Sequence, residues 1–192
     1  QEAQETVSKK RLTALIRDSG LPWEAVPDKW LSDPDVWDAL LDQLGYTALI
    51  RSLSRLTRIG YVQPLSIGLR RTLDKIGDPA AIKRGRVHPI QLLVALLSYQ
   101  SSKSRGGLEW EAVPQVTDAL NDAFYTSFGF VEPTGKQTLL ALDISGSMAG
   151  DVVAGVEGLT PRVASAALAM VTARTEQDYH IMAFSGGFVP LN

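Results

Sequence analysis

The chain has 192 residues, of which 45% are apolar and 21% are charged, and it contains no cysteine. These proportions are those of ordinary globular proteins, and they exclude a wholly disordered chain, a collagen and a coiled-coil rod. The absence of cysteine excludes disulfide scaffolds, thiolate zinc sites, iron–sulfur clusters and cysteine nucleophiles. No apolar run approaches the roughly 20 residues that cross a bilayer, so no transmembrane helix and no membrane partner are expected.

The net charge of −2 hides a strong asymmetry along the chain. Residues 47–105 contain 11 basic and two acidic side chains, a sum of +9, whereas the remainder contains 8 basic and 19 acidic ones, a sum of −11. A basic block of this kind indicates an anionic partner such as a nucleic acid. Two alternatives are that the two parts of the chain attract each other, or that the block is simply solvated.

Residues 1–128 are predicted to form short helices joined by tight breaks. Several breaks place a capping side chain before proline, as in Asp33-Pro34, Asp78-Pro79 and His88-Pro89, a combination that starts helices. The predicted helices cover 5–18, a segment from Pro34, 47–60 with Thr47 as cap, 65–76, segments from Pro79 and Pro89, and 115–128. So many short helices favour stacked helical pairs, with a compact bundle as the alternative.

The pattern changes near Gly129, and residues 129–137 have the turn-rich composition of a linker. Residues 138–142 form a short apolar run typical of a buried parallel strand, a helix starts at Thr160-Pro161, and 179–184 is a second strand candidate. The order strand, helix, strand predicts a βαβ unit over 138–192. Two parallel strands cannot cover both faces of a sheet, so we expect further sequence to complete it.

Asp143, Ser145 and Ser147 directly follow the first predicted strand. Ligands bind at the carboxyl edge of such sheets, and alternate side chains of an extended loop point the same way. One carboxylate and two hydroxyls are hard oxygen donors that suit Mg²⁺ or Mn²⁺, held weakly because only one ligand is charged. The alternative is a serine-rich turn whose hydroxyls satisfy backbone donors.

Two enzymatic interpretations of this motif fail on its residues. A phosphoryl-transfer pair of aspartates needs a carboxylate where Ser145 stands, and a nucleophile elbow needs a glycine two positions before the serine. Only His88 and His180 are available as imidazole bases. We therefore expect a protein that is not an enzyme.

The segment 47–59 carries the most informative basic pattern. At 100° per residue, Arg51, Arg55 and Arg58 lie within about 60° of one another, opposite the leucines of the same helix. Arginine suits phosphate because its guanidinium donates two hydrogen bonds. A second group of candidate RNA-binding residues consists of Lys83, Arg84, Arg86 and His88, where His88 either stacks on a base or caps the following helix. The four tryptophans, including Trp110, are expected to pack in the core or between helices.

Several segments together resemble the Ro autoantigen family. They include Thr47-Ala48-Leu49-Ile50-Arg51, Arg86-Val87-His88-Pro89, Val131-Glu132-Pro133-Thr134-Gly135-Lys136 and the stretch from Leu139 to Ser147, whose last five residues resemble the metal-ion-dependent adhesion site of von Willebrand factor A domains. The resemblance implies a TROVE domain of α-helical HEAT-like repeats, closed as a ring, followed by a von Willebrand factor A-like, Rossmann-type α/β unit.

On this resemblance, residues 1–128 correspond to the C-terminal repeats of the TROVE-like domain, 129–137 to a linker and 138–192 to the start of the A-like domain. Because earlier repeats and later strands are absent, we expect a middle segment that meets the remainder of its parent chain. Family members bind small non-coding Y RNA outside the ring and single-stranded ends of misfolded RNA through its hole, and bacterial members work with exoribonucleases. The resemblance thus implies a cytoplasmic RNA-binding scaffold of RNA quality control. The alternative is a metal-dependent protein-interaction module that uses Asp143, Ser145 and Ser147.

Overall fold

The computed structural model describes residues 8–104 and 106–190. The helices in this part are α1 (Lys9–Ser19), α2 (Pro34–Leu41), α3 (Tyr46–Arg58), α4 (Ile67–Ile76), α5 (Pro79–Arg84), α6 (Pro89–Gln100), α7 (Pro114–Ser127) and α8 (Pro161–Thr175). Short 3-10 turns join them: η1 (Trp23–Ala25), η2 (Asp28–Trp30), η3 (Phe128–Phe130), η4 (Gly146–Ala149) and η5 (Val153–Gly155). None of the helices in these ranges has the length and apolar character of a membrane span. The helix predicted over 5–18 begins partly outside the described residues.

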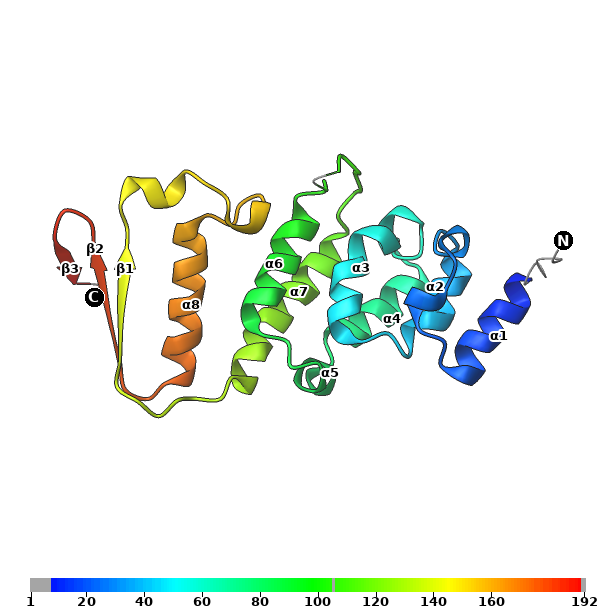
Figure 1. The fold of residues 1–192 in the computed structure, drawn as a ribbon, viewed down its shortest axis with the longest axis horizontal. Helices are drawn as coiled ribbons and strands as arrows, with labels where there is room; N and C mark the ends of the chain where they lie inside the picture. Colours follow the sequence, from blue (N-terminus) through cyan, green and yellow to red (C-terminus); the bar gives the residue numbers. More distant parts are fainter. Residues whose placement is uncertain (1–7, 105, 191–192) are drawn as a thin grey trace, which may run out of the picture.

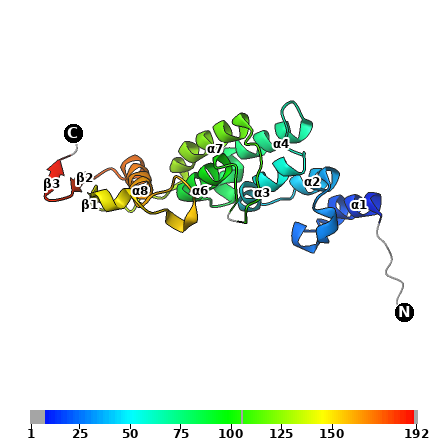
Figure 2. The ribbon, with the colours of Figure 1, turned by 90° about the horizontal axis from the view of Figure 1, so that it is seen from above.

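The helices are stacked as pairs, as the sequence predicts. Helix α3 lies beside α6, and α4 lies beside α7, so the pair α3–α4 packs against the pair α6–α7. In Figure 1 the elements form a row, from α1 at one end through the helical pairs to α8 and the sheet at the other. Figure 2, turned by 90°, shows the same row. The N-terminal part is therefore a stack of HEAT-like helical pairs.

Local capping explains where most helices begin. The Asp33 carboxylate accepts the N–H of Asp35 at 2.9 Å, and the Asp78 carboxylate accepts that of Ala80 at 2.8 Å. Helix α3 differs from the prediction, because it begins at Tyr46 after Gly45 rather than after Thr47. The buried Tyr46 hydroxyl donates to the carbonyl of Ile76 at 2.7 Å, so a tertiary contact holds the first turn of α3.

One apolar core runs through the stacked helices. The leucines opposite the arginines of α3, namely Leu49, Leu53 and Leu56, are all buried in it, as predicted. Polar contacts also join α4 to α2: the Arg71 guanidinium on α4 contacts the carboxylate of Asp38 on α2 and that of Asp42, which directly follows α2. Much of this packing therefore joins helices that are distant in sequence.

The C-terminal part is a small α/β unit. Strand β1 (Thr138–Asp143) pairs in parallel with β2 (Tyr179–Phe184), and Leu140 lies opposite Ile181. A third strand, β3 (Phe188–Pro190), which the sequence analysis did not anticipate, pairs antiparallel to β2. It forms because Gly186 and Gly187 permit a tight reversal, in which the Ser185 N–H donates to the Gly187 carbonyl at 3.1 Å.

Helix α8 lies between the sheet and the helical stack (Figure 1). Ala167 and Val171 of α8 belong to the core of the helical stack, whereas Ala169 on α8 and Ala183 on β2 are buried outside it. Figure 2 shows α8 on one side of the sheet. Leu139 on β1 is 63% exposed, so apolar surface of the sheet is left uncovered within the described residues.

Candidate functional site

The arginine stripe of α3 has the arrangement that the sequence predicts. Arg51, Arg55 and Arg58 are all exposed, on the side opposite the buried leucines. None of the three forms an ion pair or a side-chain hydrogen bond with another residue in the described ranges. The stripe thus presents three guanidinium groups to solvent, each able to donate two hydrogen bonds to a phosphate.

The second predicted group surrounds the turn between α5 and α6. Lys83, Arg84 and Arg86 are exposed, and Arg84 pairs loosely with Asp78 at 3.5 Å. This turn lies against the start of α3, because a Cβ at Gly85 would meet the Cβ of Tyr46 at 3.1 Å. The second basic group therefore lies next to the first turn of α3.

His88 acts as the cap of α6 in this structure. Its Nδ1 accepts the N–H of Ile90 at 3.2 Å, and its own N–H donates to Oε1 of Gln91 at 3.1 Å. The imidazole is exposed, but its Nδ1 lone pair is already engaged with the backbone. Of the two roles that the sequence left open for His88, the cap is the one that the geometry displays.

Not all of the basic block is available to a ligand. Arg71 is held by Asp38 and Asp42, and the Lys75 ammonium donates to the carbonyls of Leu41 and Asp42 at the end of α2. Burial lowers the pKa of Lys75. These two cations bind acidic or carbonyl groups from outside the block, so attraction between the two parts of the chain, the alternative raised above, accounts for a share of the asymmetry.

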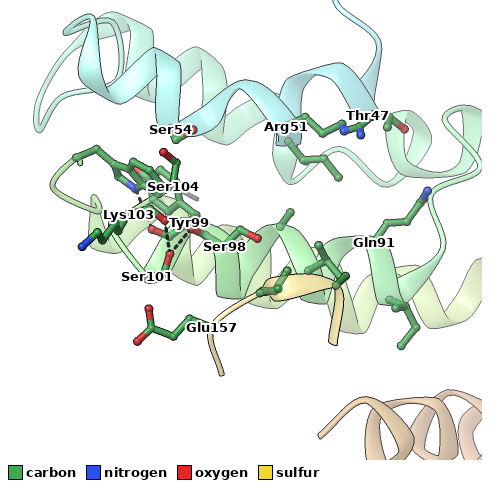
Figure 3. A pocket seen from close by; sticks show the side chains of 18 residues that line it. Thr47, Arg51, Ser54, Gln91, Ser98, Tyr99, Ser101, Lys103, Ser104 and Glu157 are labelled. Carbon is green, nitrogen blue, oxygen red and sulfur yellow. Dashed lines mark hydrogen bonds between the residues drawn. The ribbon is translucent and has the colours of Figure 1, made fainter. Parts of the chain in front are cut away.

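A groove of about 1030 Å³ lies between α3 and α6, and sequence reasoning missed most of its lining. Arg51 lines it from α3, whereas Lys103 and Trp110 line it from the segment after α6, and Glu157 lines it from the segment after η5 (Figure 3). Only Arg51 was among the predicted site residues. The only hint in the sequence was the serines and the basic, glycine-rich run 101–107. This run could not predict the groove, because three separate segments of the chain have to come together to form it.

The D-x-S-x-S motif forms a tight turn at the carboxyl end of β1. Oδ1 of Asp143 accepts the N–H of Ser145 at 2.8 Å, and the hydroxyls of Ser145 and Ser147 are 3.0 Å apart. The backbone hydrogen bond from Ser145, followed by its hydroxyl, holds the pKa of Asp143 below its ordinary value. The carboxylate is therefore ionised at neutral pH, beside two convergent hydroxyls.

These three side chains fit a weakly held divalent cation. They supply one charged and two neutral oxygen ligands, and water would complete the octahedral shell that Mg²⁺ requires. In the described ranges, no group of three or more histidine, aspartate or glutamate side chains gathers as a denser metal site. Arg162 donates to the carbonyls of Ile144 and Ser145, at 3.3 and 3.1 Å, and its positive charge works against tight cation binding.

Comparison with known proteins gives matches over most of the chain. The TROVE domain family matches residues 15–106, and the Ro60 vWA domain family matches residues 137–192. The RNA-binding protein RO60 of Deinococcus radiodurans is 42% identical over 192 residues, which are 99% of this chain and 36% of the relative. The RNA-binding protein RO60 of Caenorhabditis elegans is 33% identical over 179 residues, 92% of this chain and 27% of the relative.

A solved structure extends the comparison to the fold. The crystal structure of the Deinococcus radiodurans RO (RSR) protein superposes with a TM-score of 0.84 at 43% sequence identity, over 93% of this chain and 36% of that protein. The chain thus spans about a third of the length of these two Deinococcus proteins. Because the two family matches occur in this order and the fold agrees, the chain belongs to the Ro autoantigen family, with a TROVE segment followed by a Ro60 vWA segment.

Proposed function

We propose that the chain is the RNA-contacting part of a ribonucleoprotein scaffold and does no chemistry itself. The observation that carries the proposal is the stripe of Arg51, Arg55 and Arg58, which is exposed, one-sided and without acidic partners in the described ranges. Its relatives RO60 from two organisms are named RNA-binding proteins. Exposed cations that form no ion pair within the protein can bind the phosphates of a nucleic acid and release the counterions condensed on it.

The finer part of the proposal follows the family resemblance. The RNA is a small non-coding Y-like RNA or a misfolded RNA with a single-stranded end, in cytoplasmic RNA quality control. The remainder of the parent chain and an exoribonuclease are the proposed protein partners.

The test is the salt dependence of RNA affinity. Replacing Arg51, Arg55 and Arg58 with alanine should weaken binding of single-stranded RNA and reduce the slope of log K against log salt by about 0.7 for each phosphate that no longer meets a guanidinium. The matched control replaces Lys10, Arg11 and Arg174, which are also exposed and carry the same total charge. If both triple variants lose affinity equally, net charge alone explains the binding and the stripe has no special role.

The second candidate function is a metal-dependent protein-interaction module at the D-x-S-x-S motif. It is favoured by the 3.0 Å separation of the Ser145 and Ser147 hydroxyls next to the ionised Asp143. A divalent cation bound there would offer an open position to a carboxylate of a partner protein. Asp143 would supply the charge, and the two hydroxyls would orient the site.

Titration with Mn²⁺, followed by paramagnetic broadening of amide resonances, separates this function from a plain turn. Asp143→Ala should abolish broadening near Ser145, and Ser147→Ala should only weaken it. Asp151→Asn, which changes an exposed acid in the same loop, should leave it unchanged. Equal broadening in the wild type and Asp143→Ala would identify the motif as a structural turn.

A further inference from the structure

The groove between α3 and α6 has walls from both parts of the chain. Thr47, Arg51 and Ser54 line it from α3, and Ser98 is among the residues that line it from α6. Figure 3 shows Lys103 and Glu157 near the end of the groove marked by Ser101, and Thr47 and Gln91 toward the other end. Its volume of about 1030 Å³ is at the upper end of ligand-binding pockets, which span roughly 300–1,000 Å³.

The lining has the mixture of groups that unpaired nucleotides require. Ile50, Val94 and Ala95 supply apolar surface that suits the flat face of a base. The hydroxyls of Thr47, Ser54 and Ser98, all partly buried, form no hydrogen bond with another residue in the described ranges. Half-buried hydroxyls of this kind are satisfied by water or by a ligand. Base edges and the ribose 2′-hydroxyl offer both donors and acceptors to them.

The charge of the groove suits a phosphate chain. Arg51 and Lys103 are exposed cations at different places along it, and neither has an acidic partner among the residues that the structure describes. The basic turn at Lys83, Arg84 and Arg86 lies beyond the Thr47 end, because Gly85 packs against Tyr46. A strand in the groove would therefore meet Arg51 and Lys103 within it, and the basic turn lies near its Thr47 end.

Trp110 is held rigidly at this groove, which makes it suitable for stacking. Its indole Nε1 donates to the Tyr99 carbonyl at 2.9 Å, and its ring stacks on that of Tyr99 with centroids 6.4 Å apart. The Tyr99 hydroxyl in turn bonds to Thr57 on α3 and accepts the N–H of Val113. An aromatic ring that is already immobilised loses little entropy when a base stacks on it.

The remaining wall is the segment Ala154–Glu157, which belongs to the α/β unit. This wall is anchored, because the Val153 N–H donates to the carbonyl of Leu159 at 2.6 Å and Leu159 is buried in the core of the helical stack. Glu157 places a negative charge at the groove. A bound phosphate would be repelled by this carboxylate and attracted by Arg51 and Lys103.

We propose that this groove seats a short unpaired stretch of RNA, with phosphates at Arg51 and Lys103 and a base against Trp110, and that Ala154–Glu157 forms one wall of the site. The inference rests on the proposed RNA-binding function and assigns part of it to a composite site. Duplex RNA does not fit this description, because its bases are paired and cannot reach the apolar floor.

The first test fills the groove without changing its charge. Ser98→Trp should weaken binding of a short oligouridylate roughly tenfold, the effect of losing one stacked base, and leave the salt slope and duplex binding unchanged. Gln100→Trp adds the same side chain to an exposed position of α6 outside the groove and should bind like the wild type. Circular dichroism checks that both variants are folded.

Two further comparisons change only exposed residues, so they do not require the fold to accommodate a new tryptophan side chain. Arg51→Ala should lose more oligouridylate affinity than Arg58→Ala, although both remove one guanidinium from the same stripe. Glu157→Gln should raise oligouridylate affinity severalfold, whereas Glu111→Gln, an exposed acid outside the groove, should not.

The outcomes separate the groove from the general RNA-binding function. If folded Ser98→Trp binds oligouridylate like the wild type, or Arg51→Ala and Arg58→Ala are equivalent, the groove is not the seat of the strand. The triple arginine variant would still lose affinity in that case. If the triple variant also binds normally, the proposed function itself is wrong.

Discussion

The helical stack and the α/β unit differ in how completely they bury their hydrophobic surfaces. In the stack, the core runs without interruption from Leu12 on α1 to Phe128 after α7, and the exposed face carries charge. In the α/β unit, only one side of the sheet meets α8, and Leu139, Tyr179 and Phe188 remain at least 41% exposed. The arginine stripe therefore lies on a part with its own core, whereas the D-x-S-x-S motif lies on a part whose apolar surface is only partly covered within the described residues.

The largest expected effect compares two leucine truncations. Leu53→Ala removes a side chain that is 1% exposed in the stack and should lower the free energy of unfolding by about 2–5 kcal/mol. Leu139→Ala removes a side chain that is 63% exposed and should change it by less than about 0.5 kcal/mol. Urea denaturation followed by circular dichroism measures both. Similar losses for the two variants would show that the sheet face is covered in solution.

A second prediction concerns the polar flank of the stack. Arg71→Ala should destabilise the chain by about 1–3 kcal/mol, because the partly buried Asp38 loses its main partner. Arg84→Ala removes a 3.5 Å pair to Asp78 whose arginine side chain is 73% exposed, and it should cost at most about 1 kcal/mol. Urea denaturation followed by circular dichroism measures the loss of unfolding free energy for both variants. An equal cost for both would mean that Arg71 contributes only a surface charge.

The uncovered sheet face should make the chain self-associate. Leu139→Lys should shift light-scattering profiles toward the monomer, since a charge on this face opposes stacking of two sheets. Leu65→Lys places the same charge on a fully exposed leucine of the stack and should have little effect. If Leu65→Lys instead shifts the chain toward the monomer, self-association occurs through the helical stack and not through the sheet face.

The smallest expected effect concerns the linker between the two parts. The Glu176 carboxylate accepts the N–H groups of Thr134 and Gly135 at 2.7 and 3.1 Å, and these bonds, the one from Thr134 foremost, lower its pKa. A lowered folded-state pKa contributes stability above the ordinary glutamate value of about 4.3, and this contribution is lost as pH falls through the folded value.

Hydrogen exchange at these two amides, measured from roughly pH 6 to pH 3, should therefore show protection that decreases toward acid. Glu176→Gln should remove the pH dependence of protection, and Glu132→Gln, in the same linker, should retain it. Unchanged protection in Glu176→Gln would mean that other groups hold the linker.

Local chemistry made the helix starts and the arginine stripe predictable. Asp33-Pro34, Asp78-Pro79 and Thr160-Pro161 act within a single turn, so no distant residue alters them. The start of α3 was predicted wrongly because Tyr46 bonds to Ile76, 30 residues away. Strand β3 was not anticipated, since three residues after a hairpin give too short a pattern.

The composite groove could not be predicted from the sequence for a related reason. Trp110 was expected to pack between helices, and its contact with Tyr99 confirms that packing, yet the same ring also lines the groove. Glu157 carries no motif at all and reaches the groove only because Leu159 is buried in the helical core. Sites assembled from segments about 50 residues apart leave no local pattern to detect.

The position of α8 has a consequence for how the chain melts. Ala167 and Val171 contribute to the core of the stack, and Ala169 is buried outside that core, so one helix is shared by two hydrophobic layers. Detaching the sheet by itself would therefore expose α8 surface that the stack does not cover, and detaching α8 would open the stack at α6. The helical stack and the α/β unit should therefore unfold in a single calorimetric transition, as one cooperative unit rather than as two independent ones.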